Sequence, residues 1–302
     1  MSQKHVNFGI IALAFIGVVA FEQPARATAI NDLFVFGDSY SDTGAYVPLT
    51  NGSTAVGYLA QDLGINLVTP QNAHPGTSGV NFAESGARVA IGPTPPATHP
   101  LSLTQQVAEF QNYVTTSAVS FNPNSTLFML LGGLNDHPTR PTGASPAEIA
   151  AATISQVTTL YGLGARLFDI AQVPSLVPAF ADSAANVNPV FRSLVPQLQT
   201  EFPGATIRLG NWGADYDAIL SSPSAYGITN TTDPCYNFAT NGPACSTPNT
   251  YFYYYNSHPS AAVHQIVGSE LVAEADAIPE PYSFVLLGTG LIASLLISRK
   301  RV

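Results

Sequence analysis

Four short polar motifs carry the residue types that acyl-transfer chemistry needs. Ser39 follows an apolar run in a tight turn (GDSYSDTG), where its hydroxyl can act as a nucleophile and its own N–H can face a reacting carbonyl. Gly86 lies in a polar loop (NFAESGA), and a residue without a Cβ lets a backbone N–H approach a ligand. Asn135 (GGLND) offers a side-chain amide to an oxyanion, and His258 (NSHPS), expected at the start of the last helix, suits a general base.

The segments between these motifs predict strands that alternate with helices. Apolar runs predict buried strands at 33–36, 126–131, 166–171 and 205–209. Apolar stripes and capping residues predict helices at 53–63, 101–114, from 145 onward, at 187–202 and at 258–275. This alternation predicts an α/β fold with a parallel sheet and helices on both faces. Sites in such sheets lie at the carboxyl ends of the strands, where the serine and asparagine motifs fall.

The four motifs, in this order, resemble the GDSL family of lipases and esterases, also called SGNH hydrolases. The resemblance implies a flavodoxin-like three-layer α/β/α sandwich with a parallel sheet. It implies that Ser39 attacks an ester carbonyl and that His258 takes its proton. It further implies that the N–H of Ser39, the N–H of Gly86 and the side-chain amide of Asn135 bind the tetrahedral oxyanion. No metal or organic cofactor is expected.

One position departs from the family's pattern. The family usually has an aspartate three residues before the histidine, and that position here is Tyr255. In serine-protease examples, loss of the triad acid costs roughly 10⁴-fold in rate. Three interpretations are open: a backbone carbonyl orients His258 and leaves a working dyad, Asn256 or a distant acid such as Asp233 replaces the aspartate, or the protein mainly binds. The presence of all four other residues favours the dyad.

The charge distribution excludes several classes of partner. The formal net charge is −9, and between Thr28 and Pro281 there are five Arg, no Lys and 18 Asp or Glu, a net charge of −13. Nucleic-acid binding rests on clustered Lys and Arg, so a nucleic-acid binder is excluded. Attachment to anionic lipid by charge is excluded for the same reason. A neutral ester, such as an acyl lipid or an acylated saccharide, is therefore the expected substrate rather than a free polyanion.

Both ends of the chain predict export. Residues 1–29 have the form of a secretory signal peptide, with an apolar run followed by an A-x-A site; a short membrane anchor or buried helix is the alternative. Residues 277–302 combine Pro-Glu-Pro, a short apolar stretch and a terminal basic cluster, and so resemble the PEP-CTERM sorting signal of Gram-negative bacteria; an ordinary tail anchor is the alternative. The hydrolase domain is expected at 30–276, with membrane contact only through the two end segments.

Processing and location follow from these end segments. Signal peptidase and an exosortase-type enzyme are the expected processing partners. The predicted location is the periplasm, the cell surface or the extracellular matrix, after transient anchoring in the inner membrane.

Cys235 and Cys245 are the only cysteines in the sequence. An even pair in an exported chain predicts one local disulfide, with two free thiols as the alternative.

The sequence thus predicts an exported serine ester hydrolase. The competing interpretation is a non-catalytic or weakly catalytic surface protein that binds acylated exopolysaccharide, and the missing aspartate motivates it. His264, six residues beyond His258, is expected to be a packed or solvated helix residue. Asp38 and Asp42 are expected to set the geometry of the turn around Ser39.

Overall fold

The computed structural model describes residues 29–44, 49–90, 100–137, 143–237, 242–243 and 245–278. The predicted leader and sorting tail lie outside these ranges, apart from residue 29 and residues 277 and 278. Within the described ranges, none of the helices has the length and apolar character needed to cross a bilayer.

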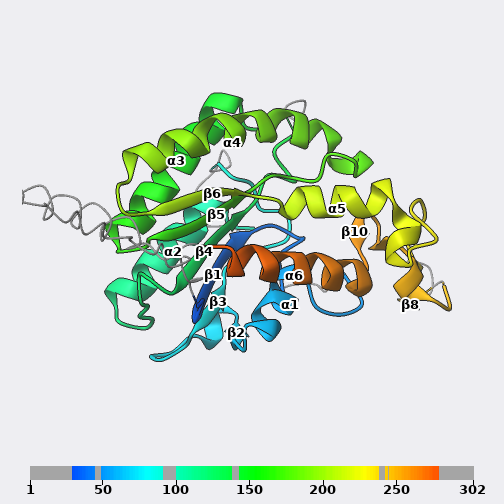
Figure 1. Ribbon diagram of the computed structural model, residues 1–302, viewed down its shortest axis with the longest axis horizontal. Helices are drawn as coiled ribbons and strands as arrows, with labels where there is room; N and C mark the ends of the chain where they lie inside the picture. The colour runs from blue at the N-terminus through cyan, green and yellow to red at the C-terminus, as the bar shows by residue number, and fades with distance from the viewer. Residues whose placement is uncertain are drawn as a thin grey trace, which may run out of the picture.

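Six parallel strands form the central sheet, in the order β2-β3-β1-β4-β5-β6 (Figure 1). Their bounds are β1 (Asp32–Gly37), β2 (Leu67–Val68), β3 (Gly79–Asn81), β4 (Thr126–Leu131), β5 (Leu167–Ala171) and β6 (Thr206–Gly210). β1 and β4 are central and almost wholly buried, which agrees with their continuous apolar sequences. Gly37 pairs with Leu131, so these two strands end side by side at the carboxyl edge of the sheet.

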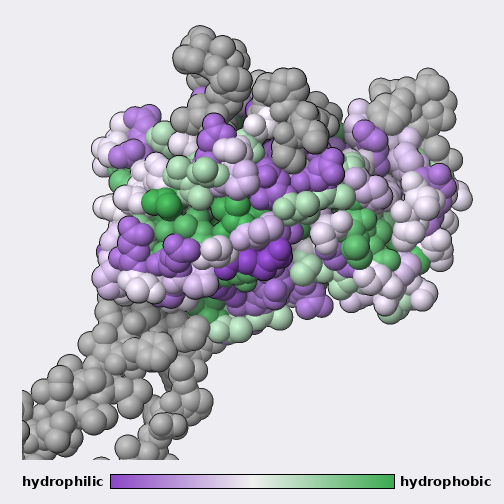
Figure 2. Space-filling view, turned by 90° about the horizontal axis from the view of Figure 1, so that it is seen from above, coloured by the Kyte–Doolittle hydropathy of each residue, from purple (hydrophilic) through white to green (hydrophobic). Residues whose placement is uncertain are grey.

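Helices cover both faces of the sheet. Their bounds are α1 (Ala55–Asp62), α2 (Leu103–Thr115), α3 (Pro146–Gly162), α4 (Ala181–Glu201), α5 (Trp212–Ser221) and α6 (Ala261–Asp276). The neighbours α2, α3 and α4 form one layer, and α1, α6 and α5 form the other (Figure 1). The outer surface on the side of α3 and α4 mixes hydrophilic residues with separate hydrophobic patches (Figure 2). The fold is therefore the predicted three-layer α/β/α sandwich.

Short elements fill the connections. They are η1 (Pro70–Asn72), η2 (Pro178–Phe180), η3 (Pro223–Tyr226), η4 (Pro248–Thr250), β7 (Tyr236–Asn237), β8 (Gly242–Pro243), β9 (Tyr253–Tyr255) and β10 (His258–Pro259). β9 and β10 pair as an antiparallel hairpin that leads directly into α6. The four predicted strands and the start of α3 at Pro146 are confirmed.

Two predicted helix starts are wrong, and three elements were missed. α4 begins at Ala181 rather than 187, because its first turns are rich in Asp, Ser and Asn, which are weak helix formers and hide the helical pattern. The sequence did not predict α5 or the short strands β2 and β3. The last helix begins at Ala261 rather than at His258, because a residue before a proline is driven toward extended backbone and Ser260 then caps the helix.

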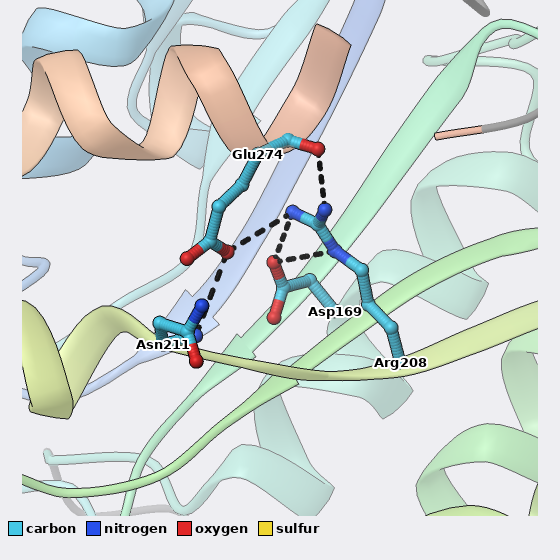
Figure 3. Close-up of polar contacts among 4 residues, drawn as sticks. All are labelled: Asp169, Arg208, Asn211 and Glu274. Carbon is cyan, nitrogen blue, oxygen red and sulfur yellow. Dashed lines mark hydrogen bonds and ion pairs between the residues drawn. The ribbon is translucent and has the colours of Figure 1, made fainter. Parts of the chain in front are cut away.

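Arg208 joins the sheet to the last helix (Figure 3). Its Nη2 lies 2.7 Å from a carboxylate oxygen of Asp169 on β5 and 3.4 Å from one of Glu274 on α6. Its Nη1 also donates to the backbone carbonyl of Glu274 in the last turn of α6, which accepts the N–H of Ala277 as well. Asp169 is fully buried, so Arg208 both compensates that acid and holds the carboxyl end of the helix that follows His258.

Replacing Arg208 with leucine should destabilise the protein strongly. Burial raises the pKa of Asp169 and Arg208 opposes that shift, so Arg208→Leu leaves an uncompensated acid in the interior. We expect a loss of about 3–5 kcal/mol in the free energy of unfolding at pH 7 by urea denaturation. Arg166→Leu is the control: that guanidinium donates to backbone carbonyls and leaves no buried acid behind. Equal losses for the two variants would contradict this account.

Candidate active site

The turn after β1 holds Ser39 at the carboxyl edge of the sheet. The N–H groups of Ser41 and Asp42 both donate to the carbonyl of Asp38 at 3.0 Å, which closes the turn around the serine. The Asp38 carboxyl accepts the N–H of Leu134 at 3.1 Å and so ties this turn to the loop after β4. Burial raises the pKa of Asp38 to about 8, and backbone N–H groups oppose the shift. Asp38 therefore fixes the geometry of the turn around Ser39, as predicted.

Gln106 on α2 anchors the end of β1, and the sequence did not single it out. Its Oε1 accepts the N–H of Gly37 at 2.8 Å, and its Nε2 donates to the carbonyl of Gly37 at 2.9 Å. The side chain is fully buried. A buried glutamine among apolar helix positions was the available signal, because buried amides are retained where they satisfy backbone groups.

The Gly86 loop is attached to the same turn. The Asp42 carboxylate accepts both the N–H and the hydroxyl of Ser85, at 3.0 and 2.8 Å. Gly86 has φ of +90°, and a Cβ at this position would come 3.1 Å from the Pro100 ring. Both the left-handed backbone and the close approach require glycine here. Asp42, like Asp38, therefore sets the geometry around Ser39.

Asn135 lies in the loop after β4 and points back to the Gly86 loop. One N–H of its side-chain amide donates to the carbonyl of Ala87 at 2.8 Å. The adjoining Leu134 is held through its N–H by Asp38 and through its carbonyl by the hydroxyl of Ser183. An amide group has two N–H donors, so the second is left for a ligand. The serine, glycine and asparagine motifs are thus bonded into one cluster.

His258 is oriented by a backbone carbonyl. Its Nδ1 lies 3.1 Å from the carbonyl oxygen of Tyr255, across the β9–β10 turn in which Asn256 has φ of +53°. A carbonyl only accepts, so Nδ1 carries the proton and Nε2 has a free lone pair. Burial lowers the pKa of His258 to about 4, and the bond to the Tyr255 carbonyl opposes that shift.

Neither candidate substitute for the aspartate reaches His258. Asp233 is exposed and accepts the side-chain N–H of Asn230 at 3.1 Å within its own turn. Asn256 is exposed at the tip of the hairpin. Within the described residues, neither one hydrogen-bonds the imidazole.

The predicted disulfide between Cys235 and Cys245 is present. The N–H of Cys235 donates to the carbonyl of Tyr253, and this bond attaches the disulfide loop to β9.

Tyr40 brings the histidine hairpin to the serine turn. Its hydroxyl donates to the carbonyl of Ser257 at 2.6 Å, although 217 positions separate the two residues. The centroid of its ring lies 5.7 Å from that of the His258 imidazole. Ser39 and His258 each adjoin one end of this hydrogen bond, so the histidine hairpin lies beside the turn that carries Ser39.

His264 has a structural position. Its Nδ1 accepts the N–H of Ala55 at 3.3 Å and pairs with the Tyr216 hydroxyl at 2.8 Å. Ala55 is the first residue of α1, whose N-cap Thr54 makes no side-chain capping bond, so the imidazole satisfies an otherwise unpaired helix N–H. Burial lowers the pKa of His264 to about 3, with a further contribution from nearby His258. In the part of the chain that the structure describes, no group of three or more His, Cys, Asp or Glu is arranged to hold a metal ion.

The parallel sandwich, with its polar residues gathered at the carboxyl edge, is the architecture of the SGNH-type α/β hydrolases. Residues 33–271 match the family model described as GDSL-like lipase/acylhydrolase. This chain therefore belongs to that family, and it is a hydrolase that acts on ester bonds.

Characterised relatives include two esterases. An acetylesterase of Thermothelomyces thermophilus is 28% identical over 305 residues, which cover 88% of this chain and 95% of that protein. Acetylajmalan esterase 2 of Rauvolfia serpentina is 24% identical, with 89% and 96% covered. Among solved structures, a lipolytic protein of the G-D-S-L family from Veillonella parvula has a TM-score of 0.48 at 12% identity, covering 82% of this chain and 99% of that one.

The two buried histidines should stay neutral far into the acid range. In the folded protein we expect the His258 imidazole to titrate near pH 4 and that of His264 near pH 3. Two-dimensional ¹⁵N NMR of the imidazoles, with His258→Gln and His264→Gln variants for assignment, measures both. The protein unfolded in urea is the control and should titrate near 6.5. Because both folded pKa values are depressed, the neutral histidines favour the fold fully above pH 6.5. This contribution is lost as the pH falls from 6.5 toward 4 for His258 and toward 3 for His264. Titration of either group near 6.5 in the folded protein would contradict the burial argument.

Proposed function

We propose that this chain is an exported serine ester hydrolase in which Ser39 is the nucleophile and His258 the general base. The observation that carries the proposal is the bond from His258 Nδ1 to the Tyr255 carbonyl at 3.1 Å. It leaves the Nε2 lone pair free to take the proton of Ser39 as the hydroxyl attacks an ester carbonyl. The imidazolium gives this proton to the departing alcohol oxygen as the ester C–O bond breaks, which leaves the acyl group on Ser39 Oγ. Water, deprotonated by His258, then attacks that acyl group, and the proton returns to Ser39 Oγ as the carboxylic acid is released.

The oxyanion formed in each step is bound by three donors. These are the N–H of Ser39, the N–H of Gly86 and the second N–H of the Asn135 amide. Support comes from the hydrogen bonds that hold each group before substrate binds. The Asp38 carbonyl closes the turn around Ser39, the N–H of Ser85 beside Gly86 donates to Asp42, and Asn135 donates to Ala87. Donors that are already oriented need no reorganisation when the charge develops, so they stabilise the transition state.

The Tyr255 carbonyl replaces only part of what a triad aspartate does. It fixes the tautomer and the orientation of the imidazole, because a carbonyl accepts the Nδ1 proton and cannot donate in its place. It carries no charge, however, and so stabilises the imidazolium less than a carboxylate would. Burial lowers the pKa of His258 to about 4, and the bond to the Tyr255 carbonyl opposes that shift only in part. We therefore infer a working dyad with a modest turnover rate.

We propose short acyl esters of neutral alcohols or saccharides as substrates. The acidic central region, with its net charge of −13, repels polyanions. Two relatives that span most of the chain carry names of acetyl-ester hydrolases. Both observations favour an acetyl or similarly small acyl group on an uncharged partner.

Export is part of the proposal. It rests on the leader at 1–29, the sorting tail at 277–302 and the Cys235–Cys245 disulfide, since disulfides persist mainly outside the cytoplasm. Signal peptidase and an exosortase-type enzyme would process the ends, and the hydrolase would act in the periplasm, on the cell surface or in the matrix of a Gram-negative bacterium.

Loss of either reacting side chain should abolish hydrolysis. We expect Ser39→Ala and His258→Ala to reduce kcat on p-nitrophenyl acetate by about 10³-fold or more, while the oxyanion donors support a small residual rate. Fluorophosphonate should label the wild type and not Ser39→Ala. Wild-type protein that neither turns over esters nor reacts with the probe, yet binds acylated glycan, would favour the non-catalytic alternative.

Tyr255→Asp should restore the family's acid. A carboxylate beside the imidazole stabilises the imidazolium, so we expect kcat on p-nitrophenyl acetate to rise by about tenfold or more, a fraction of the roughly 10⁴-fold seen when proteases lose their acid. Tyr255→Phe is the matched control and should remain near wild type, because the backbone carbonyl is unchanged. No gain in Tyr255→Asp would mean that another group already supplies the charge.

The pH profile should show a working base at acid pH. The base must be neutral, and burial lowers the pKa of His258 to about 4. kcat/KM should therefore rise through about pH 4 and be level by pH 6. In Tyr255→Asp the added carboxylate should move this rise to higher pH, since it favours the imidazolium. A rise centred near 6.5 in the wild type would contradict the assignment of a buried, uncharged site.

A further inference from the structure

Tyr40 is a fully buried tyrosine within the polar turn that carries Ser39. It follows Ser39 directly, and its side chain is 0% exposed. A buried tyrosine needs a partner for its hydroxyl, and this one donates to the carbonyl of Ser257 at 2.6 Å. Ser257 directly precedes His258. The hydrogen bond therefore closes a small ring that runs from Ser39 through Tyr40, across to Ser257, and on to His258.

The ring of Tyr40 is held from several sides. Phe180, Trp212 and Tyr216 pack against it edge to face, with centroids at 5.5, 5.9 and 5.1 Å. The His258 imidazole packs against it at 5.7 Å, tilted by 56°. Such contacts fix the plane of the tyrosine ring, since aromatic pairs prefer particular orientations. The hydroxyl is thereby aimed at one point on the histidine hairpin.

A second buried hydrogen bond supports this arrangement from behind. The N–H of Ala55 donates to His264 Nδ1, so that nitrogen has no proton and the Tyr216 hydroxyl must donate to it as well. This bond fixes the orientation of the Tyr216 side chain, and the Tyr40 ring packs against that side chain. Helices α1, α5 and α6 meet at this point, so the tyrosine rests on the rigid part of the fold.

We propose that Tyr40 is a positioning residue, whose hydroxyl holds the peptide before His258 so that the imidazole stays aligned with Ser39. This rests on the proposed function of the same site. The Tyr255 carbonyl sets which way the imidazole faces within its hairpin, and Tyr40 sets where the hairpin lies relative to the nucleophile. A site that lacks the charged acid depends more heavily on such alignment, because misplacement by about 1 Å costs on the order of 10²-fold in rate.

Tyr40→Phe is the direct test, because it keeps the ring and removes only the hydroxyl. We expect kcat on p-nitrophenyl acetate to fall by about 10- to 100-fold while KM stays within about twofold, since alignment is needed in the transition state rather than for binding. Tyr113→Phe is the matched control: it also removes a hydroxyl bonded to a backbone carbonyl, that of Pro70 at 2.9 Å. Its kcat should match the wild type.

A double-mutant cycle separates positioning from general loss of structure. If Tyr40 acts through His258, adding Tyr40→Phe to His258→Ala should change the residual rate by less than about twofold. Undiminished kcat in Tyr40→Phe, a rise in KM alone, or full additivity with His258→Ala would each overturn the inference. Thermal unfolding of Tyr40→Phe and Tyr113→Phe shows whether the two variants remain folded to a similar degree.

An NMR measurement keeps the inference separate from the proposed function. In Tyr40→Phe we expect the His258 imidazole signal to broaden and its pKa to move upward toward the solvent value, because a loosened hairpin admits water. The Tyr113→Phe signal should be unchanged. Wild-type protein without ester hydrolysis would refute the proposed function, whereas an unchanged His258 titration in Tyr40→Phe would refute the positioning role alone.

Discussion

The carboxyl end of β1 is buried, and its backbone N–H and carbonyl groups must therefore find partners inside the protein. Gln106 hydrogen-bonds both the N–H and the carbonyl of Gly37, and the Asp38 carbonyl accepts the N–H groups of Ser41 and Asp42. An unsatisfied buried group costs about 1–3 kcal/mol, so these bonds are a condition of folding. The same condition fixes the backbone that carries Ser39, the proposed nucleophile.

The buried acids extend this constraint to the neighbouring loops. The Asp38 carboxyl accepts the N–H of Leu134 and Asp42 accepts from Ser85, so the loops after β4 and β3 are tied to the turn after β1. Asn135 closes the set by donating to Ala87. The donors proposed for the oxyanion are consequently oriented by bonds that the folded state needs in any case. Activity and stability share the same hydrogen bonds at this edge of the sheet.

The histidine follows a different principle. It lies on a two-stranded hairpin outside the main sheet, and the partners that the described residues give it are aromatic rings and a backbone carbonyl. Burial without a charged partner keeps the imidazole neutral, which is the form a base requires. In the proposed mechanism, the imidazolium is consequently stabilised less than it would be by a carboxylate. The disulfide, the Tyr40 hydroxyl and helix α6, itself fixed by Arg208, all limit movement of this hairpin.

Local pattern was enough to identify the alternating strands and helices, the parallel sheet and the four residues at its edge, because apolar runs and turn motifs are encoded over a few neighbouring positions. Local pattern also explains the two wrong helix starts. The prediction for α4 begins too late because weak helix formers hide its first turns, and the prediction for the last helix includes His258 although the following proline disfavours helix there. Only the tertiary structure decided what orients His258, since a backbone carbonyl leaves no mark in residue type. It alone decided that Tyr40 meets Ser257 and that His264 caps α1, because those bonds join residues about 200 positions apart.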